Sequence, residues 1–162
     1  MLYMNFIDGF SEAEYNGRRY FQQRLDASSA VTDYNFTESK FDKVDCYWST
    51  PSSWNVGEIK YRQGYKSTDK CMVEGGAVLE KHKYDHLKYL QNVSGCTPYY
   101  ITMFNDSVGY IFDLSDMENV EWVEEKNKYP KTTMGDKSKI TKAVTYLPLS
   151  SGKKFGFNIN VT

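Results

Sequence analysis

Hydrophobic and polar residues alternate along two neighbouring segments of the chain, residues 43–48 and 55–62, and this alternation is typical of β-strands. One face of each segment is apolar or small, and these faces comprise Val44, Cys46 and Trp48 in the first segment and Gly57, Ile59 and Tyr61 in the second. The loop between the segments, residues 49–54, contains Pro, Ser and Thr, which favour turns. The pattern therefore predicts an antiparallel hairpin.

The opposite face of the predicted hairpin carries charged residues. If the turn centres on residues 51–52, Asp45 lies directly across from Glu58, and two facing carboxylates destabilise a sheet. A divalent cation between them would remove this repulsion, because Mg2+ is held by one or two carboxylates together with water and substrate phosphates. Lys60 follows on the same face and points at the same place. A cation beside a Lys can orient a water molecule and stabilise charge that develops on a phosphate.

The rest of the pattern predicts a mixed chain of helices and strands. A capping-box sequence at residues 11–14 begins a helix that we expect over residues 12–25, and a pair of glycines precedes a second helix expected over residues 77–91. Strands are expected over residues 33–38, 43–48, 55–62, 98–104, 108–114, 143–148 and 155–161, with a short helix or a turn over residues 116–125. The fold class is therefore α/β, with a mixed sheet.

The predicted elements form one domain over residues 1–162. Its first part, residues 10–115, has the order α-β-β-β-α-β. Its last part, residues 116–162, is expected to add strands to the edge of the same sheet.

A lysine interrupts the apolar face of the second predicted helix. At about 100° per residue, the stripe consists of Leu79, His86, Leu87 and Leu90, and Lys83 falls in its middle. One interpretation is that the stem of Lys83 lies along the core while its ammonium group reaches the edge. The other is that the ammonium group reaches the charged face of the hairpin or a substrate phosphate.

Asp45, followed after twelve residues by Glu58-Ile59-Lys60, resembles the D…ExK core of the PD-(D/E)xK, or restriction-endonuclease-like, nuclease superfamily. The hydrophobic residues around the motif and the α-β-β-β-α-β order also resemble that superfamily, although Val44 precedes the Asp where a Pro gives the superfamily its name. The resemblance implies a nuclease that uses Mg2+, with Mn2+ as a substitute, to hydrolyse phosphodiester bonds in DNA. The small size is similar to that of phage or mobile-element nucleases and junction resolvases.

The resemblance also implies roles for individual residues. Asp45 and Glu58 would bind the metal, with the carbonyl of Ile59 as a further ligand. Lys60 would position or activate the water, and Lys83 would orient the phosphate. Glu12 or Glu14 is a candidate for the helical carboxylate that often completes such a site, although helix capping and the helix dipole explain both residues equally well. The alternative function is a catalytically inactive nucleic-acid-binding or protein-interaction module on the same fold.

The charge of the chain restricts how it would contact nucleic acid. A net charge of −1 excludes a uniformly basic surface, so any contact requires local patches. Arg62 and Lys66 continue from Lys60 in one patch, and they are the predicted nucleic-acid contacts. A second patch comprises Lys126, Lys128, Lys131, Lys137, Lys139 and Lys142. Tyrosines near the hairpin could stack on bases.

The sequence contains few signals for targeting or for further partners. No apolar run approaches the ~20 residues of a membrane span, and the first residues lack the basic flank of a signal peptide, so we expect a cytoplasmic protein with no membrane partner. The three cysteines, with no C-x-x-C spacing, fit reduced thiols. A homodimer would suit double-strand cleavage, but no motif indicates one.

Overall fold

The structure is a computed structural model, and it describes residues 11–38, 43–130 and 139–160. The described part contains two α-helices, α1 (Glu12–Ala27) and α2 (Lys81–Ser94). Its strands are β1 (Asp33–Phe36), β2 (Cys46–Thr50), β3 (Ser53–Arg62), β4 (Ala77–Glu80), β5 (Thr97–Phe104), β6 (Val108–Asp113), β7 (Val123–Pro130), β8 (Lys139–Leu147) and β9 (Lys153–Gly156). A π-helical turn, Cys71–Gly75, and a 3-10 turn, Leu149–Ser151, complete it.

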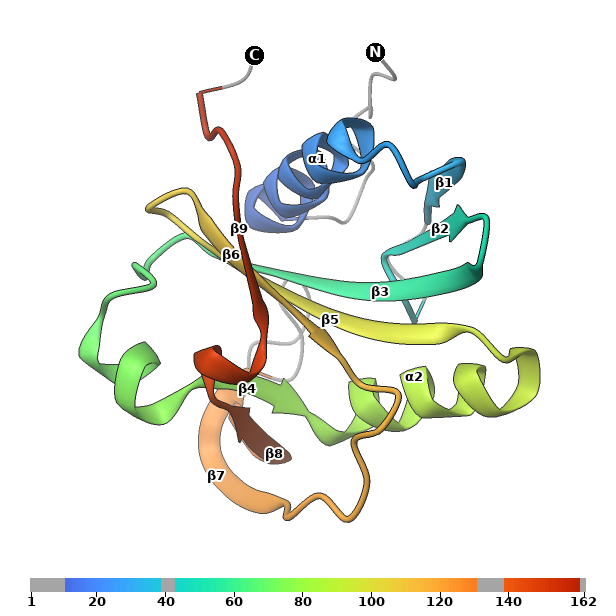
Figure 1. Ribbon diagram of the computed structural model, residues 1–162. Coiled ribbons are helices and arrows are strands. Elements are labelled where there is room, and N and C mark those ends of the chain that lie inside the picture. The colour runs from blue at the N-terminus through green and yellow to red at the C-terminus, as the bar shows by residue number, and fades with distance from the viewer. Residues whose placement is uncertain (1–10, 39–42, 131–138, 161–162) are drawn as a thin grey trace.

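A six-stranded mixed sheet with the order β1-β2-β3-β5-β6-β9 forms the centre of the molecule (Figure 1). Its neighbouring strands are antiparallel except for β3 and β5, which run parallel. A parallel pair needs a long crossover, and the segment that contains β4 and α2 supplies it. The structure therefore confirms the expected α/β class.

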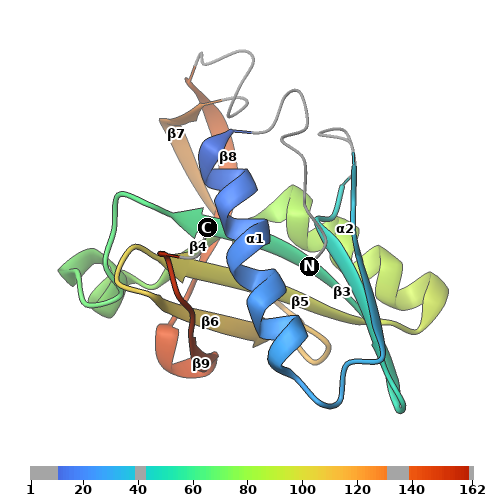
Figure 2. The same ribbon diagram turned by 90° about the horizontal axis from the view of Figure 1, so that it is seen from above.

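Helix α1 covers one face of this sheet (Figures 1 and 2). It begins at the N-cap Ser11, whose hydroxyl accepts a hydrogen bond from the N–H of Glu14, as in a capping box. A Cβ on Gly17 would lie only 3.0 Å from the Cβ of Tyr61 and 3.2 Å from Cγ2 of Ile59. The absence of a side chain at Gly17 thus lets α1 pack closely against β3 at this position.

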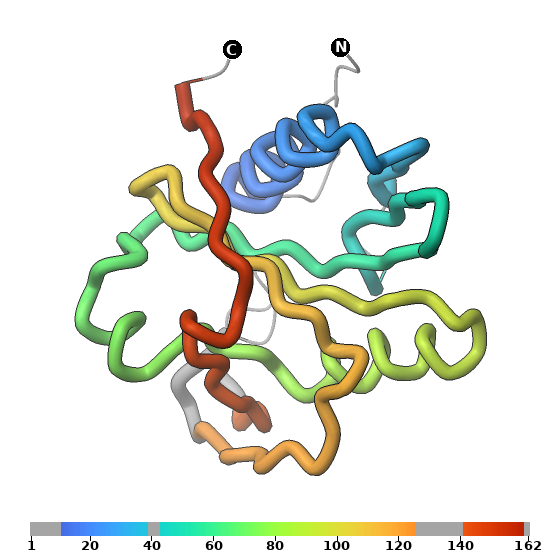
Figure 3. Tube along the Cα trace, viewed as in Figure 1, coloured from blue at the N-terminus to red at the C-terminus, as the bar shows by residue number. Residues whose placement is uncertain are grey.

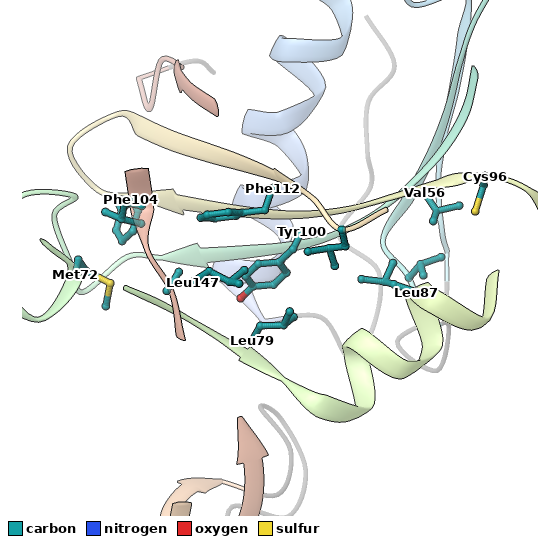
Figure 4. Packing of buried hydrophobic residues seen from close by; sticks show 13 residues of the cluster. Val56, Met72, Leu79, Leu87, Cys96, Tyr100, Phe104, Phe112 and Leu147 are labelled. Carbon is teal, nitrogen blue, oxygen red and sulfur yellow. The ribbon is translucent and has the colours of Figure 1, made fainter. Parts of the chain in front are cut away.

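Helix α2 and a second sheet cover the opposite face of the central sheet (Figure 1). The second sheet is antiparallel and has the order β4-β8-β7. Between the layers lies a buried apolar cluster, and Figure 4 shows Tyr100, Phe104 and Phe112 of the central sheet facing Leu79 of β4 and Leu87 of α2. The buried face of the central sheet thus packs against strands as well as a helix.

Two of the predicted elements differ from the structure because of strand pairing. Residues 77–80, expected to begin the second helix, form β4, which pairs with the end of β8 from Val144 to Leu147. Tertiary pairing overrides the helical period there. The C-terminal strands do not all extend the central sheet: β9 pairs with β6, but β7 and β8 join β4 instead. The trace in Figure 3 shows the C-terminal segment leaving this second sheet and crossing to the central one.

Gly57 in β3 tests how tightly the α1 side of the central sheet is packed. A Cβ there would lie 2.9 Å from Cδ1 of Ile101 and 3.0 Å from the ring of Trp48. We expect Gly57→Ala to lower the free energy of unfolding by about 1–3 kcal/mol through overpacking, measured by urea denaturation. Gly64→Ala is the control, because nothing lies within 4 Å of a Cβ at that position. Equal stability of the two variants would contradict this packing.

Candidate active site

Asp45 lies at an irregularity at the start of β2. The two strands pair from Cys46 opposite Gly57 to Thr50 opposite Ser53, which is the predicted register. The N–H of Asp45 also donates to the carbonyl of Gly57 at 2.9 Å, so two residues of one strand oppose one residue of the other. This arrangement is a β-bulge, a feature that changes the direction of a side chain.

The bulge corrects two expectations about the hairpin. Asp45 is not directly across from Glu58, because it shares the partner of Cys46. Val44 does not share a face with Cys46 and Trp48: it belongs to the buried cluster on the α2 side, whereas those two residues belong to the cluster under α1. The extra residue in the bulge reverses the alternation of faces before Cys46.

Hydrogen bonds fix both oxygens of the Asp45 carboxylate. Oδ2 accepts from the backbone N–H of Ile59 at 2.7 Å, so the side chain bridges to the next strand. Oδ1 accepts from Nη2 of Arg18 at 2.7 Å, and the Arg18 side chain is only 4% exposed. Arg18 also donates to the carbonyl and the hydroxyl of Thr37. A buried guanidinium from α1 thus holds the carboxylate in place.

Arg18 was not among the predicted site residues, although the sequence contains a signal for it. It lies three and seven residues before Phe21 and Leu25, which are both buried on the face of α1 that packs on the sheet. A charged residue within an apolar stripe needs a partner, and this is the same signal that identified Lys83. The partner of Arg18 could not be identified, because α1 and Asp45 are far apart in the sequence.

Glu58 is buried in the middle of β3 and paired with a lysine from α2. Its Oε1 accepts from Nζ of Lys83 at 2.7 Å. Burial and the nearby charge of Asp45 raise the pKa of Glu58 to about 8, although Lys83 opposes this shift. Burial lowers the pKa of Lys83, but the charges of Glu58 and Asp45 outweigh it and raise that pKa. Lys83 thus reaches the site from the opposite layer, while its role toward a phosphate stays a prediction.

Lys60 lies on the same face of β3 as Glu58. The residue as a whole is exposed, but protein atoms surround its ammonium group closely enough that desolvation lowers its pKa, and the charge of Arg62 adds to this effect. The negative charges of Glu80, Glu14 and Glu58 act in the opposite direction. Lys60 therefore has an amine that releases its proton more readily than an ordinary lysine does.

A group of charged side chains around Glu80, not predicted from the sequence, lies at the junction of β4 and α2. Glu80 is the residue that precedes α2, and its Oε1 accepts from Nζ of Lys142 of β8 at 3.1 Å. Its Oε2 lies 3.3 Å from Nε2 of His82. The charge of Glu80 acts to raise the pKa of Lys60, so a residue of the second sheet influences the candidate site electrostatically.

The structure gives several predicted residues other surroundings. Glu14 accepts from the Ser11 hydroxyl at 3.1 Å within the helix cap, while its charge also acts on the pKa of Lys60, and Glu12 is exposed in the first turn of α1. Ligation of a metal by Glu14 stays a prediction. Arg62 donates to the hydroxyls of Thr102 and Tyr100 and to the carbonyl of Val78, and so links the two sheets. Its contact with nucleic acid stays a prediction.

Three further predictions are not decided by the structure. Lys66 is exposed after β3, and its contact with nucleic acid stays a prediction. For Ile59 the N–H, rather than the carbonyl, meets the Asp45 side chain, and ligation of a metal by that carbonyl stays a prediction. In the second basic patch, Lys142 is the residue whose side chain is described, and the other five lie outside the described side chains.

No protein-family model matches the chain, and comparisons with curated proteins and with solved structures give no match either. Within the described residues, no helix is both long and apolar enough to span a membrane. Across the same residues, no group of three or more His, Cys, Asp or Glu side chains is placed to hold a metal ion. Asp45 and Glu58 remain the predicted carboxylate ligands of a metal at the candidate site, with water and substrate as further ligands.

The pair formed by Arg18 and Asp45 can be tested through stability. Arg18→Met leaves the largely buried carboxylate without its cation, and we expect the free energy of unfolding to fall by about 3 kcal/mol. The control is Lys81→Met, which removes an exposed ion pair with Asp85 and should cost less than about 1 kcal/mol. Urea denaturation measures both. Similar losses in the two variants would show that Arg18 does not depend on a buried partner.

The raised pKa of Glu58 predicts a pH dependence. Between about pH 4.5 and 8, folded Glu58 retains a proton that the unfolded chain has released, so its contribution to stability is lost as the pH rises. We expect Glu58→Gln to increase the free energy of unfolding relative to the wild type, by an amount that grows from about pH 5 to about pH 8. Urea denaturation at these pH values measures the difference.

Comparing Glu58→Gln with the wild type separates the effect of Glu58 on stability from the effect of the histidines. Burial lowers the pKa of His82 and of His86, which makes stability rise with pH, but both residues are present in each protein. Glu124→Gln on β7 is the control, because Glu124 is exposed. If Glu58→Gln and the wild type differ by the same amount at every pH, Glu58 does not hold a proton in the folded state.

Proposed function

We propose that this chain is a divalent-metal-dependent nuclease of the PD-(D/E)xK superfamily that hydrolyses phosphodiester bonds, with DNA as the expected substrate. The observation that carries the proposal is the convergence of Asp45, Glu58 and Lys60 with Lys83, which the bulge before β2, strand β3 and helix α2 bring together. The order α1-β1-β2-β3-α2-β5 supports it as well, with β4 as an insertion before α2.

The donor set fits a hard cation. Each carboxylate oxygen can accept two interactions, and the recorded bonds of Asp45 use one position on each of its oxygens. The raised pKa of Glu58 indicates that Lys83 alone does not compensate its buried charge, and a divalent cation would do so. Such an ion, when bound, lowers the pKa of a coordinated water and stabilises charge on a phosphate.

The residues of the chain would then have separate tasks. Lys60, whose pKa is lowered, orients the attacking water and can take up its proton. The water oxygen forms the new bond to phosphorus while the bond to the 3′ oxygen breaks, and the 3′ oxygen takes a proton from solvent water, which leaves a 5′-phosphate and a 3′-hydroxyl. Lys83, which contacts Glu58 in the absence of a metal, would be available to contact the phosphate if a bound cation compensated the charge of Glu58. Arg18 does not touch the substrate, and it positions the Asp45 carboxylate.

One observation favours the alternative of a catalytically inactive module. Each carboxylate of the candidate site already has a cation of the chain itself within 2.7 Å, Arg18 for Asp45 and Lys83 for Glu58. A site neutralised in this way can persist without a metal, and the fold would then serve to bind nucleic acid or a protein.

The two functions can be separated by cleavage and metal binding measured together. Labelled single-stranded, double-stranded and branched DNAs are incubated with Mg2+ or Mn2+ and the wild type, Glu58→Ala, Lys60→Ala or Lys153→Ala. We expect metal-dependent cleavage to fall at least about 100-fold in the first two variants, because one loses a metal ligand and the other the group that acts on the water. Lys153, exposed on β9, is the control and should leave cleavage unchanged.

Metal binding is measured separately as the rise in melting temperature with Mg2+ or Mn2+ concentration. Metal-dependent stabilisation of the wild type that is lost in Glu58→Ala would support the proposed site even where the DNA panel lacks the right substrate. A wild type that neither cleaves any DNA nor responds to either metal would reject the nuclease in favour of the inactive module.

A further inference from the structure

An aromatic pair lies exposed at the hairpin end of β2 and β3. The rings of Tyr47 and Trp54 stack with centroids 5.6 Å apart and an interplanar angle of 14°. Trp54 is nevertheless 42% exposed, whereas Trp48 on the other face of the sheet is 7% exposed. One face of the Trp54 indole is thus supported by another ring while much of the residue remains open to solvent.

The pair lies on the same face of the sheet as the candidate site. Tyr47 packs against the α2-side cluster, which contains its cross-strand partner Val56. Side chains alternate along β3, so Trp54 and Glu58 lie on this face, with Val56 between them fully buried in the α2-side cluster. The four residue steps from Trp54 to Glu58 span about 13 Å, which is about four nucleotides at a stacked spacing of ~3.4 Å.

We propose that Trp54, supported by Tyr47, is a stacking platform for unpaired bases of the nucleic-acid strand whose phosphate occupies the candidate site. This inference rests on the proposed function and specifies its substrate as single-stranded, or as duplex with an unpaired segment. A base inside a duplex is already stacked on both faces and cannot lie on an indole, whereas an unpaired base can.

Exposed positive charges near this face suit contact with a nucleic-acid strand. Lys60 is exposed two residues after Glu58 on β3, and Lys43, which is also exposed, precedes the Asp45 bulge and acts on the pKa of His86 in α2. Positive charges that contact phosphates, combined with an aromatic ring that contacts bases, are the two components of single-strand binding.

The test compares a normal DNA strand with an abasic strand of the same length, which retains the phosphates but has no bases to stack. Fluorescence anisotropy of labelled oligo-dT and of the abasic strand is measured in EDTA at fixed low salt, with wild type, Trp54→Ala, Trp54→Phe and Tyr65→Ala. We expect Trp54→Ala to bind oligo-dT about 5- to 100-fold more weakly and the abasic strand as the wild type does. Trp54→Phe should retain most of the affinity, and Tyr65→Ala, which removes another exposed aromatic ring, should retain all of it.

Several outcomes would overturn the platform. They are absence of oligo-dT binding by the wild type, equal binding by Trp54→Ala and the wild type, and equal losses for the oligo-dT and abasic strands. A loss in Trp54→Phe as large as in Trp54→Ala would indicate a damaged hairpin rather than a lost stacking surface. Because binding is measured without metal, a platform that fails while metal-dependent cleavage persists leaves the nuclease intact. Stacking by a protein that neither cleaves DNA nor responds to Mg2+ or Mn2+ rejects only the nuclease.

Discussion

Two contacts between a cationic side chain and a carboxyl group beside β3 are the constraint on which the site depends, and of the two cations Arg18 is buried while Lys83 is one-third exposed. Arg18 of α1 meets Asp45, and Lys83 of α2 meets Glu58, so each face of the central sheet supplies one cation to the carboxylates. Charged groups removed from water need partners at short distance, and a misplaced partner costs several kcal/mol. The positions of both helices on the sheet are therefore tied to this cluster as well as to their apolar faces.

The cluster of charged residues is not the arrangement that would give the highest stability. Well-packed apolar residues of similar volume are often as stabilising as a buried ion pair, or more so. Glu58 illustrates the cost, because burial raises its pKa to about 8 and leaves its ionised form disfavoured near neutral pH. Groups with perturbed pKa values gather at functional sites, where the ability to bind or react compensates for lost stability. The argument for a functional site beside β3 thus depends on the energetic cost of the cluster together with its geometry.

The second sheet extends the site beyond the central sheet. By pairing with β8, β4 places Glu80 at the start of α2 and brings Lys142 to it. Arg62 and Tyr100 both bond to the carbonyl of Val78 and so attach this sheet to β3 and β5. Lys60 lies between the charges of Glu58 and Glu80 as a result, and its surroundings depend on strands that are far apart in the sequence.

Local sequence was sufficient for the elements whose signals are local. Alternation and turn residues determined the register of β2 and β3, the capping box determined the start of α1, and an interrupted apolar stripe identified Lys83. Tertiary structure decided the rest, because strand partners, bulges and ion pairs join residues whose distance along the chain carries no local signal. Pairing with β8 made residues 77–80 a strand, the bulge redirected Asp45, and packing of α1 selected Arg18 as its partner. The sequence by itself thus determined which charged residues lie at positions where a fold usually places apolar ones, and only the fold determined which of these charges form contacts.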